Sequence, residues 1–132
     1  MRSFNLKVVT PDGLCFDSEV ESLLVRTDDG DVEFLAGHID YMASLGTGRA
    51  RIKADGKDRY ASVSGGFVTV KGGEVKLVAI TFEFRENIDL ERAKNARDEA
   101  KTALSSATDA IAIQIAKAKL QRALSRIDVA EG

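Results

Sequence analysis

Short runs of apolar residues, several of them alternating with polar ones, fill the first two thirds of the chain. Phe4–Val8 and Arg49–Lys53 show the period of two that is typical of a half-buried strand. Similar strand-like runs occur at residues 23–27, 60–63, 67–70 and 75–78. Turn residues such as Pro11–Gly13 separate the runs. Many short strands at this spacing predict an antiparallel β-sandwich or flattened barrel, and no helix of useful length fits before Asn87.

The pattern changes near residue 88, where apolar residues begin to recur at spacings of three and four. The apolar stripe consists of Leu90, Ala93, Ala96 (or Arg97), Ala100 and Leu104. This stripe predicts an amphipathic helix, which Asn87 or Asp89 can cap.

A second helix is predicted from about Ala110 to Val129, after a polar interruption at residues 105–109. Its apolar side is expected to comprise Ile111, Ile115, Ala118, Ala123, Leu124 and Ile127. The two helices would form an antiparallel hairpin. Because many facing residues are alanines, the helices can approach closely but bury little apolar area. Burial stabilises by only roughly 25 cal/mol per Å², so the contact is weak. A hairpin held this weakly is expected to open.

Composition divides the chain at the same place. Ten of the eleven glycines precede residue 74, whereas eleven alanines follow Arg92. We therefore expect two domains, an all-β N-terminal sandwich over residues 1–86 and a C-terminal helical hairpin over residues 87–132.

The formal net charge is −3 for residues 1–88 and +1 for residues 89–132, consistent with −2 for the whole chain. This balance gives no case for a nucleic-acid partner, although the hairpin would suit acidic surfaces or phosphates.

The antiparallel geometry brings three arginines of the predicted hairpin together. If the turn is centred between residues 106 and 107, Arg92 lies beside Arg122. Asp89 then lies between Arg122 and Arg126, which share a helix face because they are four residues apart. Guanidinium groups suit phosphate oxygens, so the cluster favours a phosphate-bearing ligand, with Asp89 and Glu83 partly balancing its charge. Solvated ion pairs between the helix ends would explain the same spacing, and both interpretations stay open.

The other chemically active residues do not assemble a catalytic site. The single cysteine, Cys15, permits no internal disulfide and is expected to be a buried structural thiol between apolar neighbours. The single histidine, His38, is expected to be a hydrogen-bonded structural or interface residue. The acidic run at residues 28–31 could bind a cation, but a solvated loop is preferred, and Ser64–Phe67 favours a strand bulge or tight turn. The sequence has no zinc cluster, Walker loop or nucleophile–base pair, so it gives no support for an enzyme acting alone.

Membrane and export signals are not visible in the sequence. No apolar run approaches the roughly 18 residues of a membrane span, and no signal peptide follows the initial methionine. We therefore expect a soluble chain that meets a membrane only through a partner.

Four short motifs occur in an order and at a spacing that are specific in combination. They are Val8–Gly13, Gly37–His38, Ser64–Phe67 and Ile88–Ala93. With these motifs the chain resembles, over essentially its whole length, the epsilon subunit of bacterial F-type ATP synthases. The resemblance implies a sandwich of about ten short strands followed by a two-helix hairpin.

The resemblance also implies a function. The chain would be a non-catalytic subunit of the rotating central stalk, contacting the gamma subunit and the ring of c subunits and coupling ion translocation to rotation and ATP synthesis. Its hairpin would extend along gamma toward the alpha/beta hexamer and inhibit ATP hydrolysis, with Arg122 and Arg126 approaching an acidic segment of a beta subunit. The chain would be peripheral, at the cytoplasmic face of the cell membrane. His38 and Asp31 are expected at a partner interface.

The motif Ile88–Ala93 fits the pattern I-D-x-x-R-A of the epsilon subunits that bind ATP as a regulatory ligand, free or with magnesium. The residues that match that site are Glu83, Ile88, Asp89, Arg92, Ala93, Arg122 and Arg126. Glu99 departs from it, because the ATP-binding members have a further arginine there, so a lower affinity is expected. An alternative function is a free-standing nucleotide-sensing adaptor without a rotary complex.

Overall fold

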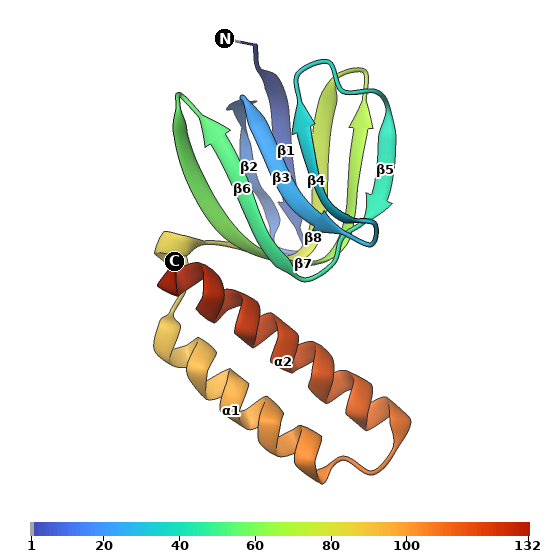
Figure 1. Ribbon diagram of the computed structural model, residues 1–132, viewed down its shortest axis with the longest axis vertical. Helices are drawn as coiled ribbons and strands as arrows, with labels where there is room; N and C mark the ends of the chain where they lie inside the picture. Colours follow the sequence, from blue (N-terminus) through green and yellow to red (C-terminus); the bar gives the residue numbers. More distant parts are fainter. Residues whose placement is uncertain (1) are drawn as a thin grey trace.

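Eight strands and two long helices make up most of residues 2–132, the part of the chain that this computed structural model describes (Figure 1). The strands are β1 (Phe4–Thr10), β2 (Gly13–Val20), β3 (Ser22–Thr27), β4 (Gly30–Leu35), β5 (Tyr41–Ser44), β6 (Gly48–Ala54), β7 (Lys57–Lys71) and β8 (Glu74–Phe84). They form one sheet in the order β2-β1-β8-β7-β6-β3-β4, and β5 pairs with β7. Of these pairs, β1 with β8 is parallel.

The sheet folds over itself into a sandwich, with β3, β4 and β6 in front of β1 and β2 in Figure 1. Residues that alternate along the strands point between the layers and form the core. Leu6, Val8, Leu23, Phe34 and Leu77 are all fully buried there. Burying one such side chain stabilises the fold by roughly 1.5–3 kcal/mol, so the period-two pattern accounts for the sandwich.

Two glycines let a single long strand serve both layers. β7 has 15 residues and bends at Gly65 and Gly66, whose φ angles are +69° and +95°. A Cβ at Gly66 would lie 1.8 Å from the Val78 carbonyl oxygen, so only glycine fits. The predicted bulge or turn at Ser64–Phe67 is therefore a bend inside one strand. The runs at residues 60–63 and 67–70, which were predicted as separate strands, thus belong to the single strand β7. The predicted sandwich is confirmed, with eight strands rather than about ten.

The acidic run at residues 28–31 only begins in a loop. Asp28 and Asp29 form a turn, and the chain then enters β4 at Gly30. Arg26 and Asp31 are cross-strand partners, and Arg26 Nε lies 2.6 Å from Asp31 Oδ1. This strand was not predicted because its glycine and acidic residues are also typical of solvated turns.

Cys15 is exposed, so the prediction that it would be buried was wrong. Val8 pairs with Phe16 and Val9 with Leu14, which leaves Cys15 as the extra residue of a β-bulge in the edge strand β2. The bulge interrupts the alternation on which the prediction depended. Cys15 Sγ donates a hydrogen bond to the Val8 carbonyl oxygen at 3.4 Å, and partial burial raises the pKa of the thiol.

A short 3₁₀ helix, η1 (Arg85–Asn87), connects the sandwich to the hairpin and is fixed to β7. The Arg59 guanidinium lies over the Phe84 ring, 3.7 Å from its centroid, and forms an ion pair with Glu86. The hydrogen bond from Arg59 lowers the pKa of the Glu86 carboxyl. The start of the connection is thus held, and the chain turns into the hairpin at Ile88 and Asp89.

The hairpin consists of α1 (Leu90–Ser106) and α2 (Ala110–Glu131). Asp89 caps α1 by accepting a hydrogen bond from Arg92 N at 3.1 Å, and Asp109 caps α2 in the same way. The predicted helices are confirmed. Their turn is centred near Thr108, slightly later than the sequence analysis placed it.

Small residues form the seam between the helices, as the sequence predicted. Ala93, Ala100, Ala116 and Ala123 are buried. The predicted apolar side of α2 was partly wrong, because Ile111, Ile115 and Leu124 are 71%, 52% and 45% exposed. Away from the sandwich α2 has only α1 as a neighbour, so apolar residues outside the alanine seam have nothing to cover them.

Candidate functional site

Three side chains on neighbouring strands form a row on the outer face of the sandwich, against which α2 docks. Arg49 of β6 pairs with Ser62 of β7, which in turn pairs with Glu83 of β8. We call these three residues the docking row. Its contacts with α2 are Arg49 Nη2 to Asp128 Oδ2 (3.1 Å), Ser62 Oγ to Ser125 Oγ (2.8 Å) and Arg126 Nε to Glu83 Oε1 (2.7 Å). All three involve the C-terminal part of α2, which lies next to the sandwich in Figure 1 while the turn of the hairpin points away.

A cavity of about 240 Å³ opens where the sandwich, η1 and both helices meet. It is lined by Glu83, Asn87, Asp89, Arg92, Ala93 and Arg126. We call this the junction cavity. β8 supplies Glu83, η1 supplies Asn87, and the other four residues come from the hairpin and its cap. A ligand bound here would therefore touch both the sandwich and the hairpin.

The charges in the junction cavity are only partly paired. Arg126 and Glu83 form an ion pair, with side chains 28% and 36% exposed. Asp89 Oδ1 caps α1 through the Arg92 main-chain N–H, so Asp89 has a structural role besides any role in binding. The Arg92 guanidinium has no ion-pair partner within the described residues. The cavity thus offers one free cation and one that a ligand would share with Glu83.

The structure brings together five of the seven residues predicted for an ATP site. They are Glu83, Asp89, Arg92, Ala93 and Arg126. Arg122 lies instead in an adjoining cavity of about 420 Å³, which also contains Glu99, Lys119 and Arg126. Ile88 does not line either cavity, and its N–H donates to the Arg85 carbonyl oxygen at 3.2 Å. Asn87 was considered only as a helix cap and was missed as a lining residue.

Two family models match the chain in succession. The beta-sandwich domain of the ATP synthase delta/epsilon chain matches residues 3–85, and the long alpha-helix domain of the same chain matches residues 86–131. The ATP synthase epsilon chains of Bacillus velezensis and Bacillus subtilis are 41% and 43% identical over 130 residues, with 98% of both chains covered. This chain belongs to the ATP synthase delta/epsilon family. Membership confirms the resemblance to the epsilon subunit and the prediction of a non-catalytic subunit rather than an enzyme acting alone.

Solved structures of distant proteins share the fold of this family member. A chain of the Euglena gracilis mitochondrial ATP synthase structure of OSCP, F1 and c-ring superposes with a TM-score of 0.82 at 24% identity, covering 98% of this chain and 82% of that one. A chain from the central stalk and c-ring structure of the Tetrahymena thermophila mitochondrial ATP synthase gives a TM-score of 0.70 at 11% identity, covering 98% and 97%. Both support the sandwich-plus-hairpin architecture.

The two residues predicted at a partner interface lie at different ends of β4. Asp31 is at its start, paired with Arg26, whereas His38 follows its end. The His38 ring lies edge-on to Phe34, with centroids 4.9 Å apart, and its Nδ1 is 2.7 Å from the Ile39 carbonyl oxygen. His38 therefore orders the β4–β5 loop of this delta/epsilon-family chain. A partner that contacts both residues must cover the length of β4.

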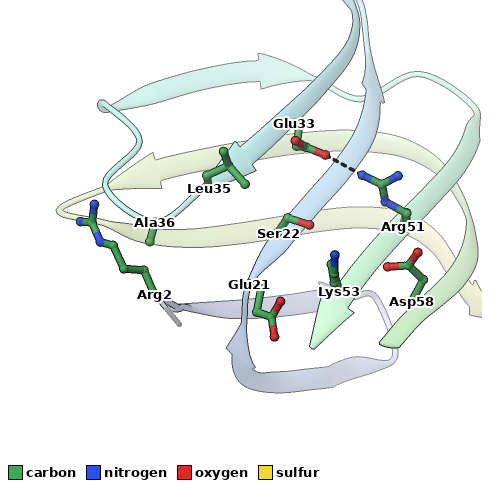
Figure 2. Close-up of a pocket in the computed structure, with 9 residues that line it drawn as sticks. All are labelled: Arg2, Glu21, Ser22, Glu33, Leu35, Ala36, Arg51, Lys53 and Asp58. Atoms are coloured by element: carbon green, nitrogen blue, oxygen red, sulfur yellow. Dashed lines mark hydrogen bonds and ion pairs between the residues drawn. The ribbon is translucent and has the colours of Figure 1, made fainter. Parts of the chain in front are cut away.

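A third cavity, of about 490 Å³, lies on the outer face of β3, β4 and β6, and Figure 2 shows the side chains around it. It is lined by Arg2, Glu21, Ser22, Glu33, Leu35, Ala36, Arg51, Lys53 and Asp58. Arg51 pairs with Glu33 at 2.5 Å. Three cationic and three anionic side chains balance, so the cavity has no net preference for either sign of charge. Within residues 2–132, no cluster of three or more His, Cys, Asp or Glu side chains is arranged to hold a metal ion.

Proposed function

We propose that this chain is the epsilon subunit in the central stalk of a rotary ATP synthase, where it couples ion translocation to rotation and ATP synthesis. The sandwich is the platform that contacts the gamma subunit and the c-subunit ring, and the hairpin regulates ATP hydrolysis. Two observations support the stalk role. Both domains of the family follow each other over residues 3–131, and the relatives named ATP synthase epsilon chain align with 98% of the chain.

The regulatory part of the proposal depends on how the hairpin is attached. Among residues 2–132, its hydrogen bonds and ion pairs to the sandwich come from the C-terminal part of α2, and they include the three contacts of the docking row. The ion pairs are partly exposed, and pairs of this kind contribute only about 0–1 kcal/mol each. No described residue of the hairpin belongs to the apolar core of the sandwich, so this core should persist when the hairpin leaves. The hairpin can therefore dock and release without unfolding the platform, and in the released state it reaches the alpha/beta hexamer and inhibits hydrolysis.

Removal of the hairpin from the assembled complex tests the regulatory role. A chain that ends at Ile88 retains the whole sandwich and η1. ATP hydrolysis by the complex should rise relative to the complex with the full chain at equal subunit occupancy. An unchanged rate would leave the hairpin with a structural role only. The adaptor alternative predicts instead that the chain does not co-purify with a gamma subunit.

The junction cavity is the proposed site for regulatory ATP, free or with magnesium. Arg92 and Arg126 provide cations for phosphate oxygens, and the adjoining cavity continues past Arg122. At about 240 Å³ the junction cavity alone is smaller than typical ligand pockets of roughly 300–1,000 Å³, so ATP would extend into its neighbour. Because the site spans the sandwich and both helices, ATP would stabilise the docked hairpin. Glu83 and Glu99 oppose a polyanion, so the affinity should be modest.

Calorimetric titration of the isolated chain with ATP, with and without magnesium, tests this site. Arg92→Ala should abolish the binding heat, because Arg92 is the cation of the cavity that no carboxylate already holds. Arg26→Ala is the matched control, since Arg26 pairs with Asp31 on the sandwich and is outside both cavities. Equal binding by the parent chain and Arg92→Ala would refute the site without affecting the stalk role.

The proposed location is peripheral, at the cytoplasmic face of the cell membrane, with membrane contact only through the complex. Within residues 2–132, no helix has the length and apolar character needed to cross a bilayer. Fractionation of cells should place the chain with the membrane-bound complex, and it should be released together with the gamma subunit.

A further inference from the structure

The C-terminal end of α2 lacks a basic side chain of its own to balance its partial negative charge. The last four carbonyl groups of a helix lack the usual main-chain donors, and the helix dipole places partial negative charge there. No basic residue occurs in the last turn of α2, and its one cap bond runs from Gly132 N to the Val129 carbonyl oxygen. The helix therefore does not provide the cation that would stabilise its own end.

The sandwich provides two such cations. Arg85 Nε donates to the Val129 carbonyl oxygen at 2.8 Å, and Arg49 Nη2 donates to the Asp128 carbonyl oxygen at 3.1 Å. Both are charge-assisted hydrogen bonds to carbonyl groups in the last turn of α2. They approach from different elements, Arg49 from β6 and Arg85 from η1.

An aromatic ring holds these two arginines in place. Tyr60 of β7 has the Arg85 guanidinium 4.6 Å and the Arg49 guanidinium 5.3 Å from its ring centroid, within the range of a cation–π interaction. η1 is fixed in turn by the pairing of Glu86 with Arg59. The two donors are therefore ordered by the sandwich itself, so little side-chain freedom is lost when α2 docks.

We propose that Arg49, Tyr60 and Arg85 form a receptor on the sandwich for the C-terminal turn of α2, and that this receptor sets the fraction of hairpin that is docked. The inference rests on the proposed function of the hairpin as a moving regulator and names the contact that controls it. We call the three residues the helix-end receptor.

The receptor recognises main-chain carbonyls more than side chains. The Asp128 side chain is 68% exposed, so its ion pair with Arg49 contributes little. Hydrogen bonds from charged donors to main-chain carbonyls are stronger than exposed ion pairs, and the bond from Arg85 to the Val129 carbonyl is also partly buried. Loss of the Asp128 carboxylate should therefore have little effect on docking, whereas loss of either guanidinium should have a large effect.

The distance between two spin labels on the isolated full chain measures docking directly. One label is attached to Cys15, which is exposed on β2, and the other to Ser106→Cys at the exposed end of α1. The parent chain should give one narrow distance. Arg49→Met and Arg85→Met keep an unbranched stem of similar volume but remove the donors, and each should lower the docked-to-released ratio roughly tenfold.

Two further variants separate the receptor from general effects. Arg26 belongs to the same sandwich, but it pairs with Asp31 rather than with α2. Arg26→Met should therefore leave the distance between the spin labels unchanged. Asp128→Asn should behave like Arg26→Met. If Asp128→Asn opens the hairpin as much as Arg49→Met does, the side-chain ion pair dominates and carbonyl recognition is overturned.

An unchanged distance in the Arg49→Met, Arg85→Met double variant would overturn the receptor outright. Thermal unfolding of the sandwich, followed by circular dichroism, shows whether that variant is folded. If it is not, Tyr60→Leu, which leaves both donors in place, must broaden the distance, and a parent-like distance counts against the proposal. Hydrolysis by the complex is a separate readout. A variant that opens the hairpin without changing hydrolysis supports the receptor but contradicts the regulatory function.

Discussion

Replacement of Val129 by alanine measures the apolar share of hairpin docking. Val129 is fully buried, although it lies near the end of α2. Because the turn of the hairpin is near Thr108, Val129 lies opposite the chain before α1 begins, and its carbonyl oxygen accepts from Arg85 of η1. We therefore expect η1 and the sandwich, rather than α1, to cover its side chain. Its side chain should therefore become exposed when the hairpin releases.

The size of the effect follows from the two methyl groups that the substitution removes. At ~0.8 kcal/mol per buried group the transfer cost is about 1.6 kcal/mol. The cavity left behind raises the total to about 2 kcal/mol. This corresponds to a rise of about 30-fold in the ratio of released to docked hairpin.

Thiol trapping under the docked helix can detect this change. Ser62 is 5% exposed, and α2 covers it through Ser125. In a chain carrying Cys15→Ser and Ser62→Cys, the single thiol should react with a small alkylating reagent only when the hairpin is released. When reclosing is faster than alkylation, the rate is proportional to the released fraction.

Val129→Ala should accelerate trapping about 30-fold in that chain. Ile111→Ala is the matched control, because it shortens a larger apolar side chain of the same helix that is 71% exposed, and it should not change the rate. Equal rates for the parent and Val129→Ala would refute the reasoning. Equal acceleration by both variants would show that the helix itself, rather than its docking, had been weakened.

Three other predictions concern the nucleotide, the junction and the sandwich. Glu99→Arg replaces the carboxylate of the cavity that contains Arg122 and should tighten ATP binding on the order of tenfold in calorimetry, and no gain would place the nucleotide elsewhere. Because Arg59 lowers the pKa of Glu86 below its usual 4.5, this pair stabilises the fold above about pH 4.5 and the contribution is lost as the pH falls. Glu86→Gln should therefore flatten the acid limb of thermal stability against pH, and an unchanged slope would exclude this pair as its source. Gly66→Ala should destabilise the chain by more than about 3 kcal/mol in urea unfolding, since its Cβ would lie 1.8 Å from the Val78 carbonyl oxygen, and near-native stability would contradict the bend.

Local sequence patterns predicted the elements well where one rule decided the structure. Period two placed β1 and β6, and the spacings of three and four placed both helices. The errors occurred where two rules compete. A bulge moved Cys15 to the surface, and a glycine bend joined two predicted strands into β7. Gly30 marks a turn in the sequence, yet in the structure it begins β4.

The candidate site was predictable only in part, because its parts are far apart in sequence. Helix spacing brought Arg92 and Arg126 to the same end of the hairpin. The pairing of Glu83 with Arg126 depends on the register of β8 against β7, which no local pattern contains. The contacts of Arg49 and Arg85 with α2 were not predicted for the same reason. Every residue has a main-chain carbonyl, so residue types do not show which carbonyl an arginine will contact. Arg122 moved to the neighbouring cavity when the turn of the hairpin proved to lie closer to Thr108.

The clamp of Arg59 and Glu86 on η1 confines the pivot of the hairpin to about two residues. A helix as long as α2, with 22 residues, spans roughly 33 Å. A rotation of only about 10° at such a fulcrum sweeps the far tip through roughly 6 Å, by the same helix geometry. Sub-ångström shifts of the backbone beside Ile88 are thereby magnified into movements of the hairpin tip that are large enough to change its contacts with a neighbouring protein.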